Sequence, residues 1–372
     1  MRVILRTRSY SGGMLLNEPL TLRSLTVRNR IWLPPMCQYR CCNEDGIPGA
    51  WHMMHYGARA AGGFGLIVAE ATAIVPEGRI SNYCAGLWSQ EHVDAWAPIV
   101  SLAKSLGAAM GIQLNHAGRK ASTYPMLPQV TGRRSIPLDD AGWQTTAPSP
   151  IPSEGHAEPR ELTLEEVREL PALFTTAATR AVEAGFDFVE IHAAHGYLLH
   201  QFLSPLSNQR SDGYGGSREN RTRLLLEVVS AVREVLPDGM PLLVRLSASE
   251  WLDPEGWTLD DSRWLGAQLR DKGVDFIDVS SSGNVRANIP VEPGYQVPFA
   301  RALKDASGLP VAAVGLITDA QQAENILEAG DADAVMIGRA ALRNAEWAID
   351  ALEELGVDHA KLPYPDSYFR AY

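Results

Sequence analysis

Three side chains that could perform acid–base chemistry lie close together near the middle of the chain. His192, His195 and Tyr197 follow a short alternating run, residues 188–192, which has the pattern of a strand leaving a core. Two imidazoles and a phenol at the exit of a buried strand can polarise a carbonyl oxygen and deliver a proton beside it. One histidine at a strand end is more often structural, but the pair with its tyrosine favours a site. A zinc site is not expected, because the H-E-x-x-H pattern is missing.

Eight short apolar runs alternate with longer segments of helical spacing from residue 29 onward. The expected strands are residues 31–33, 66–69, 109–114, 188–192, 242–246, 276–279, 311–314 and 334–337. Expected helices include residues 93–106, 164–184, 218–235, 260–272, 320–329 and 345–355. Alternation of this kind implies parallel strands joined by crossover helices, and eight such units close into a TIM barrel, an α/β fold.

The ends of the expected helices support this alternation. Thr163 with Glu166, and Thr258 with Asp261, have the spacing of capping boxes. A glycine stands at three points where a helix must stop before a strand starts, namely Gly185, Gly273 and Gly330. We interpret all of these positions as architecture.

In a TIM barrel the chemistry lies at the carboxyl ends of the strands. Polar and small residues gather there in this chain, for example at Ser247 and Ser280. The insertion after the third strand, residues 119–159, is rich in proline and turn residues, and loops of that length in compact domains usually have a function. We therefore expect a hairpin lid over the barrel mouth.

Two glycines and an arginine after the last two strands indicate a phosphate site. Gly315 and Gly338 free backbone N–H groups there, and Arg339 adds a cation that can hold a phosphate. Aldolases, isomerases and flavoproteins share this feature, so by itself it narrows the ligand only to something phosphorylated.

Gln113 and Arg245 extend this site along the third and fifth expected strands. A phosphate at one end, an amide in the middle and a fixed positive charge at the other end match a long planar cofactor such as FMN, whose anionic reduced form the arginine would favour. The alternative for Arg245 is a salt bridge with Glu190 or Glu70.

The chain has 372 residues of even composition and no repetitive linker, which favours one large domain. We expect residues 1–14 to be a mobile N-terminal extension and residues 15–372 to be a single domain. A formal net charge of −11 argues against a nucleic-acid surface and gives no support to an anionic membrane partner. The four cysteines lack a C-x-x-C pair and suit a reducing cytoplasm, and no run has the length of a signal peptide or membrane span.

Several motifs resemble the Old Yellow Enzyme family, specifically its short bacterial, thermophilic-like subclass. The likeness runs from Leu16 to the C-terminus and includes PMCQY at residues 35–39, EAT at 70–72 and QLNHAGRK at 113–120. The segment HAAHGYLLHQFLSPLSNQRSDGYGGSRENR, residues 192–221, is highly specific. The resemblance implies an FMN-binding barrel that takes hydride from NADPH or NADH and passes it to the activated C=C bond of an α,β-unsaturated carbonyl compound.

The resemblance also implies roles for individual residues. His192 and His195 would bind the carbonyl oxygen of the substrate, and Tyr197, a phenol of ordinary pKa near 10, would protonate the α-carbon. Cys37 would lie near the flavin and tune its potential, although a buried inert thiol is the alternative. Tyr39 would line the substrate pocket. The residues that would hold FMN are Pro34, Pro35, Met36, Cys37, Ala71, Gln113, Arg245, Gly315, Gly338 and Arg339.

The C-terminal tail, residues 361–372, is too aromatic for a free terminus. The resemblance implies that it lies at the interface of a homodimer or homotetramer, with Arg370 reaching the substrate site of the neighbouring subunit. A frayed tail is the alternative. Lys120 would contact the substrate mouth or the loop above it.

Two other functions remain compatible with the residues. A flavin-free, phosphate-binding TIM-barrel lyase would need a lysine at a strand end for Schiff-base chemistry, and none of the eight expected strands ends in one. A non-catalytic flavin-binding protein is the second alternative.

Overall fold

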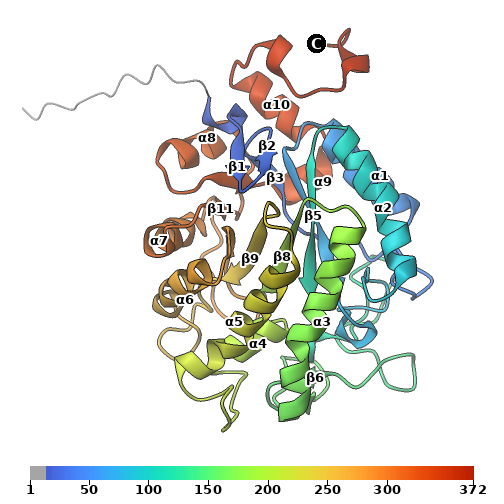
Figure 1. Cartoon of the computed structure of the whole chain (residues 1–372), viewed down its shortest axis with the longest axis vertical. Coiled ribbons are helices and arrows are strands. Elements are labelled where there is room, and N and C mark those ends of the chain that lie inside the picture. Colours follow the sequence, from blue (N-terminus) through green and yellow to red (C-terminus); the bar gives the residue numbers. More distant parts are fainter. Residues whose placement is uncertain (1–13) are drawn as a thin grey trace, which may run out of the picture.

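The computed structural model describes residues 14–372, so most of the expected N-terminal extension, residues 1–13, lies outside the described residues. Eight parallel strands form a closed barrel in the order β10-β11-β12-β3-β4-β5-β8-β9 (Figure 1). Their bounds are β3 (Ile31–Leu33), β4 (Leu66–Ala73), β5 (Ala109–Asn115), β8 (Phe188–Ala193), β9 (Leu242–Ser247), β10 (Phe276–Ser280), β11 (Val311–Ala313) and β12 (Ala334–Met336). All eight expected strands are present, and the predicted TIM barrel is confirmed.

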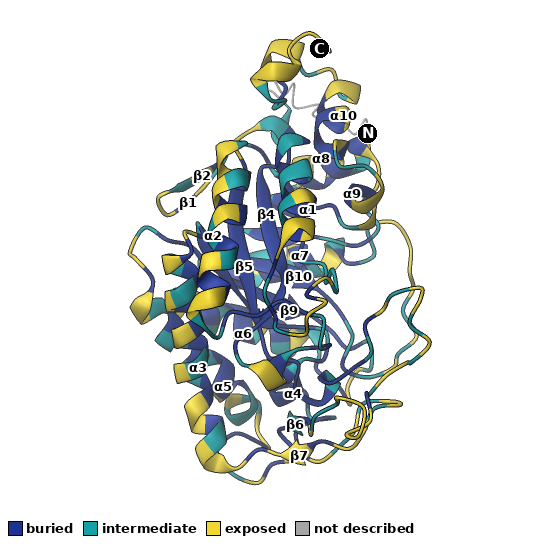
Figure 2. Cartoon of the chain, turned by 90° about the vertical axis from the view of Figure 1, so that its right-hand side faces the viewer, coloured by how far each residue is buried: buried dark blue, intermediate teal, exposed yellow. Residues whose placement is uncertain are grey.

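Helices surround this barrel. The long ones are α1 (Ala50–Ala61), α2 (Gln90–Ser105), α3 (Leu164–Glu183), α5 (Arg218–Val235), α6 (Leu259–Asp271), α7 (Val297–Ser307), α8 (Ala320–Glu328) and α10 (Trp347–Glu354). Two short helices, α4 (Leu198–Leu203) and α9 (Arg339–Arg343), follow β8 and β12. Figure 2 shows the strands buried and the outer faces of α2, α3 and α5 exposed. Among residues 14–372, no helix is long and apolar enough to cross a membrane.

The predicted helix ends are confirmed. The Thr163 hydroxyl accepts from the N–H of Glu166 at 3.2 Å, and the Glu166 carboxylate accepts from the N–H of Thr163 at 2.7 Å. Thr258 and Asp261 form the same reciprocal pair before α6. The three helix-stopping glycines adopt φ values of +85°, +88° and +72°, which a residue with a Cβ rarely adopts, at Gly185, Gly273 and Gly330 respectively.

A hydrophobic cluster closes the amino end of the barrel. Trp32 and Phe276 meet inside it with ring centroids 4.7 Å apart. Beneath them lies a hairpin that the sequence did not lead us to expect, β1 (Leu20–Leu22) and β2 (Leu25–Val27), which adds Leu22 and Val27 to the same cluster. This end is therefore packed, and a ligand can reach the interior only from the carboxyl ends of the strands.

The insertion at residues 119–159 lies at that open end, near α4 (Figure 1). It contains β6 (Thr146–Ala147), which pairs in parallel with β7 (Arg160–Glu161). The insertion is not a continuous two-stranded hairpin. Its first part is a loop whose two ends meet at one isolated antiparallel bridge, between Thr123 and Ser135. Its turns are held mainly by local backbone hydrogen bonds, such as the one from Tyr124 N–H to Arg134 C=O at 2.9 Å.

Candidate active site

His192 lies at the carboxyl end of β8, where its buried ring is held in one orientation. Its Nδ1 accepts a hydrogen bond from the N–H of Ala194 at 3.2 Å, so the proton of the neutral ring resides on Nε2. Within residues 14–372, no group bonds that Nε2. The rings of His195 and Tyr197 contact His192 edge-on, with centroids 5.3 and 4.9 Å away. The three predicted catalytic side chains therefore meet at one point.

His195 is positioned by the loop that follows β8. It adopts a positive φ of +58°, and its N–H donates to Ser247 Oγ at 2.9 Å. Its Nε2 lies 2.8 Å from Ser280 Oγ. Gly283 packs so closely that a Cβ on it would lie 2.6 Å from His195 Cα. The strained backbone of His195 is therefore held by β9, β10 and a glycine that leaves no room for a side chain.

All three side chains are uncharged at neutral pH. Removal from water, followed by the positive charge of Arg245, lowers the pKa of His192 and of His195 well below 6.5. The same removal from water raises the pKa of Tyr197 well above 10. The expectation of an ordinary phenol pKa was therefore wrong. The site presents neutral imidazole donors and a phenol that keeps its proton.

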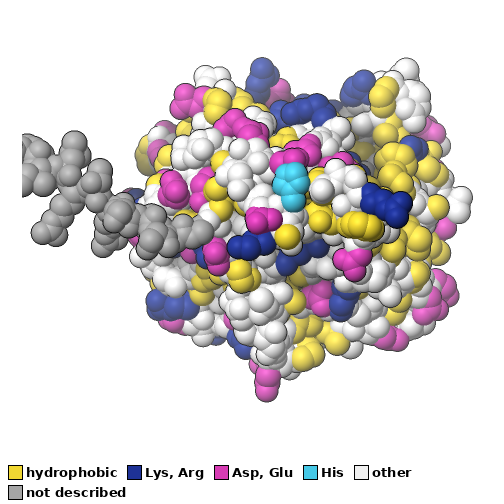
Figure 3. Space-filling model, turned by 90° about the horizontal axis from the view of Figure 1, so that it is seen from above, with side chains coloured by type: hydrophobic (Ala, Val, Ile, Leu, Met, Phe, Trp, Pro, Cys, Tyr) yellow, Lys and Arg dark blue, Asp and Glu magenta, His cyan; other side chains and the backbone are white. Residues whose placement is uncertain are grey.

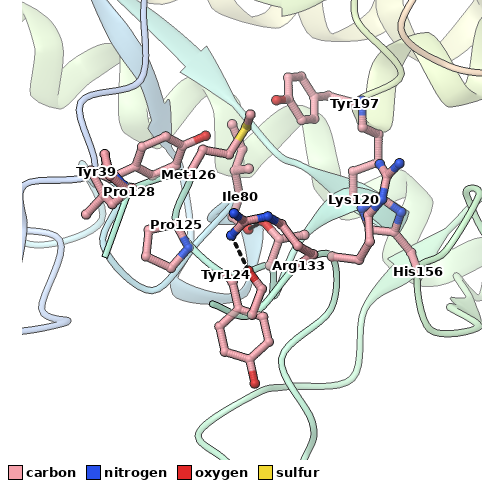
Figure 4. Close-up of a pocket in the computed structure, with 14 residues that line it drawn as sticks. Tyr39, Ile80, Lys120, Tyr124, Pro125, Met126, Pro128, Arg133, His156 and Tyr197 are labelled. Atoms are coloured by element: carbon pink, nitrogen blue, oxygen red, sulfur yellow. Dashed lines mark hydrogen bonds between the residues drawn. The ribbon is translucent and has the colours of Figure 1, made fainter. Parts of the chain in front are cut away.

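A cavity of about 730 Å³ opens beside these residues. Tyr39, Ile80 and Tyr197 line it together with residues of the insertion, among them Lys120 (Figure 4). Lys120 Nζ donates to the carbonyls of His195 at 2.7 Å and Gly283 at 2.9 Å. Lys120 thus contacts both the mouth and the loop, as the sequence indicated, and Tyr39 lies in the predicted pocket.

A second cavity of about 220 Å³ lies at the ends of β11 and β12. Arg245, Gly315, Gly338 and Arg339 line it, so the structure brings four of the predicted cofactor residues together. A Cβ on Gly338 would lie 3.7 Å from Pro34 Cγ and 3.8 Å from Met36 Sδ, which places the predicted 34–37 loop against the same cavity. Sequence reasoning missed Tyr295, Gln296 and Arg343, which also line it.

Arg245 pairs with a different carboxylate from those considered. Its Nε lies 3.0 Å from Asp278 Oδ2 on the neighbouring strand, so the proposed salt bridge to Glu190 or Glu70 was wrong. Glu190 instead accepts from the Gln113 amide at 2.8 Å, and burial followed by the charge of Asp278 raises its pKa to about 8. Arg245 and Asp278 thus form an ion pair between β9 and β10, and the carboxyl group of Glu190 on β8 is protonated at neutral pH.

The loop bearing Cys37 and Tyr39 is anchored from below by Glu70. This fully buried carboxylate accepts from the N–H of Gln38 at 3.0 Å and lies 3.1 Å from His52 Nε2. A hydrogen bond with the Cys84 thiol, and then burial, raises the pKa of Cys37 well above its usual value. Cys37 is thus a neutral thiol in this fold. It packs in one cluster with Tyr39, Tyr197, Cys84 and, at a bulge of β4, Ala71.

Arg370 is the predicted site residue that the structure does not bring to the others. It lies on the exposed tail with its guanidinium 5.7 Å from the ring of Phe369. Figure 1 shows the C-terminus at the end of the barrel opposite α4 and β6. Its predicted role in a neighbouring subunit stays a prediction.

The residues that sequence reasoning missed act through their neighbours. Ser247 and Ser280 hold His195, and both had been noted only as polar strand ends. Asp278 balances Arg245, and the two stand at equal distances before those serines, in the motifs RLS and DVS. That shared spacing is the sequence feature that could have indicated the pairing of Arg245 with Asp278. Cys84 gave no signal, because it comes from a separate loop.

The fold and the site together define a TIM-barrel enzyme with neutral acid–base groups and a phosphate-sized cavity at one mouth. A family model described as "NADH:flavin oxidoreductase / NADH oxidase family" matches residues 15–356. The NADPH dehydrogenase of Geobacillus thermodenitrificans (strain NG80-2) is 47% identical over 359 residues, which are 96% of this chain and 98% of that protein. The NADPH dehydrogenase of Bacillus subtilis (strain 168) is 44% identical over 355 residues, 95% of this chain and 98% of that one.

Comparison with solved structures points to the same family. Morphinone reductase superposes with a TM-score of 0.76 at 30% identity, covering 95% of this chain and 92% of that chain. The Old Yellow Enzyme homologue from Zymomonas mobilis superposes with a TM-score of 0.75 at 26% identity, covering 96% and 99%. The chain belongs to the Old Yellow Enzyme family, in its short bacterial subclass, and is a flavin oxidoreductase of the NADPH dehydrogenase type.

Proposed function

We propose that this protein is an FMN-dependent ene-reductase that reduces the activated C=C bond of α,β-unsaturated carbonyl compounds, with NADPH or NADH as reductant. The observation that carries the proposal is the contact of His192, His195 and Tyr197, all uncharged, next to the 730 Å³ cavity that Tyr197 lines. Neutral donors beside a protonated phenol suit a reaction in which negative charge develops on a carbonyl oxygen and a carbon takes a proton.

The residues present fit FMN. The smaller cavity combines Arg339 with the glycine-lined ends of β11 and β12, as a phosphate requires. The amide of Asn115, at the carboxyl end of β5, is buried with no hydrogen-bond partner within residues 14–372, which suits a polar ligand. The loop at Pro34, Pro35, Met36 and Cys37, together with Ala71, Gln113, Arg245, Gly315, Gly338 and Arg339, would hold the cofactor. When bound, FMN would supply the hydride that reaches the β-carbon.

His192 and His195 bind and polarise the substrate carbonyl. His192 donates from Nε2, because its Nδ1 is already an acceptor. His195 lies beside it, with its Nε2 2.8 Å from Ser280 Oγ. Ser280 Oγ donates to Gln296 Oε1 at 3.3 Å, and the same oxygen accepts from Ser281 at 2.6 Å. Ser280 and Gln296 therefore fix the position of the His195 ring.

Tyr197 delivers the proton to the α-carbon. Its hydroxyl makes no hydrogen bond to the described part of the chain, and its ring is fixed against His192 at an interplanar angle of 75°. Because its pKa is raised, the phenol remains protonated until the substrate carbon has gained negative charge.

The lyase alternative loses support from the contacts of Lys120. Two backbone carbonyls already bind its amine, at 2.7 and 2.9 Å, so Lys120 is anchored and not free to form a Schiff base. The family membership of the chain disfavours a non-catalytic flavin carrier.

A spectrum of the purified protein tests the proposal. We expect yellow protein that NADPH bleaches under nitrogen and cyclohexenone re-oxidises. Phenols should give a long-wavelength charge-transfer band that the double variant His192→Ala/His195→Ala abolishes, while Tyr39→Phe retains it. Colourless protein that does not take up FMN would overturn the proposal.

We also propose that residues 15–372 form one domain whose tail, residues 361–372, joins subunits of a homodimer or homotetramer and carries Arg370 into the neighbouring site. Tyr368 and Phe369 are 49% and 62% exposed, and Tyr368 borders a groove lined by Met53, Met54 and Leu102. Figure 3 looks onto this end of the molecule and shows hydrophobic side chains gathered at its right-hand edge. Truncation after Asp366 should raise the KM for enones and weaken assembly; unchanged kinetics would reject the role of Arg370.

A further inference from the structure

The outer part of the large cavity, which we call the lid chamber, is lined by Lys120, Arg133, Arg134 and His156 but by no aspartate or glutamate. This composition contrasts with the chain as a whole, whose formal net charge is −11. A concave surface with positive side chains and no carboxylate attracts anions, even though the net negative charge of the protein as a whole repels them.

The positive charges in the lid chamber have no counter-charge among the described residues. Lys120 and Arg133 donate to backbone carbonyls, and no hydrogen bond or ion pair within residues 14–372 holds the Arg134 guanidinium. The nearby acidic side chains have other partners, because Asp140 accepts from the Tyr124 hydroxyl at 3.2 Å and Glu154 lies 3.3 Å from Arg286.

Neighbouring positive charges add to the effect of burial on the pKa of two of these groups. Burial, and then the charges of Arg119 and Arg134, lower the pKa of Lys120 to about 8. Burial is also the main cause of the lowered pKa of His156, to which Lys120 and Arg134 contribute. An anion in the chamber would relieve this repulsion.

The lid chamber is continuous with the reacting groups. Tyr39 and Tyr197 line the same cavity, and Lys120 Nζ lies 5.0 Å from the centre of the Tyr197 ring. Figure 4 shows Lys120 and His156 on one wall, with Tyr39, Met126 and Pro128 on the other. A ligand whose reactive end lies at Tyr197 would therefore extend its remainder between an apolar wall and a cationic one.

We propose that the lid chamber is an anion subsite, which binds a carboxylate or phosphate carried by the ligand that reacts beside Tyr197. This inference rests on the proposed ene-reduction for its reactive end. The anion has two possible sources, an acidic group on the alkene or a phosphate of the nicotinamide reductant. Both offer the acceptor oxygens that arginine binds best.

Two matched ligand pairs test the subsite in the FMN-loaded enzyme. The alkene pair is 4-(3-oxobut-1-enyl)benzoate and its methyl ester, and the reductant pair is NADPH and NADH with cyclohexenone as acceptor. The variants are Arg134→Gln, the double variant Arg133→Gln/Arg134→Gln, and Arg134→Lys as the charge-conserving form. Arg263→Gln is the matched control, because Arg263 is 48% exposed on its side chain, lies on α6 and is outside the chamber.

For at least one pair, we expect the KM of the more anionic member to rise about tenfold in the double variant while its partner changes less than twofold. Arg134→Lys should recover part of the loss, and Arg263→Gln should show none. A response of the benzoate identifies the alkene as the source of the anion, and a response confined to NADPH identifies the reductant. Equal changes within both pairs, or no change in either, would overturn the subsite.

A binding measurement separates this inference from the proposed catalysis. Titration calorimetry with adenosine 2′,5′-bisphosphate and with the benzoate should show binding that weakens in the double variant and with added salt. This readout needs no turnover. Protein that lacks ene-reductase activity but binds these anions through Arg133 and Arg134 would refute the catalytic proposal alone; failure of both anions to bind the natural chain would refute the subsite alone.

Discussion

Lowering the pH from 7.5 to 5.5 should destabilise this fold through its buried histidines. Burial lowers the pKa of five of them strongly: His55, His116, His192, His195 and His200. A group with a lowered histidine pKa binds protons more readily after unfolding, so stability is lost as pH falls through the unfolded value near 6.5.

The magnitude follows from proton linkage. Each of the five histidines removes roughly 1 kcal/mol of unfolding free energy over these two pH units, or roughly 6 kcal/mol together. Glu190 opposes them, because its pKa of about 8 means that the folded state holds a proton the unfolded state releases; it returns roughly 2 kcal/mol. The raised pKa of Asp278 and of Glu250 acts in the same direction as that of Glu190. Carboxyl groups with a lowered pKa, such as Glu166, are ionised in both states above pH 5.5 and change little. The net loss is roughly a few kcal/mol, a large part of a typical domain stability of roughly 5–15 kcal/mol.

Urea unfolding at both pH values, with FMN saturating, measures this loss. Calorimetry in two buffers of different ionisation enthalpy counts the protons, and we expect an uptake of about three on unfolding at pH 5.5. His55→Gln lies in α1, away from the site, and should reduce that uptake by about one. An uptake below one proton in the natural chain, or a midpoint that does not shift between the two pH values, would refute the assignment of neutral buried histidines.

Three further outcomes are expected. Tyr197→Phe should slow re-oxidation by cyclohexenone about 10²- to 10⁴-fold in stopped-flow traces while bleaching by NADPH is unchanged; equal effects on both half-reactions would contradict its role as proton donor. Thr163→Ala should lower the unfolding free energy by about 1 kcal/mol in urea titrations through loss of the capping box, and an unchanged midpoint would show that the cap contributes nothing. Above pH 8, where Lys120 loses its proton and hence a positive charge, the KM of the anionic ligand should rise relative to that of its uncharged partner; parallel pH profiles would exclude Lys120 from the subsite.

The barrel was predictable because its strands are buried on both faces and read as short apolar runs. Helices with a clear apolar stripe, such as α3 and α5, were predictable for a similar reason. Helix α1 was missed because it buries His52, His55 and Arg59 alongside Tyr56 and Ala60, so polar residues interrupt its core-facing stripe. Helix α7 was missed because it follows a segment with two prolines and a glycine at residues 290–294 and has Pro298 in its own first turn.

The site was predictable where one continuous motif carries it and less so where separate strands meet. His192, His195 and Tyr197 lie within six residues of each other, and the sequence places them together. The partner of Arg245 depends on the register between β9 and β10, which fixes Asp278 opposite it and which apolar patterning does not specify. The raised pKa of Tyr197 depends on burial by loops distant in the chain, and no local pattern reports it.

The pairing of β3 with β12 has a consequence for how the chain is made. Val335 lies opposite Ile31, so β3, the first strand of the barrel, can pair with β12 only after nearly the whole chain has been made. While a ribosome is still producing the chain, β3 and the growing edge strand keep unpaired backbone groups, and every intermediate is an open sheet. Because such edges can pair with other chains, slow translation through the final third should increase aggregation, and chaperones that shield nascent sheets should improve the yield.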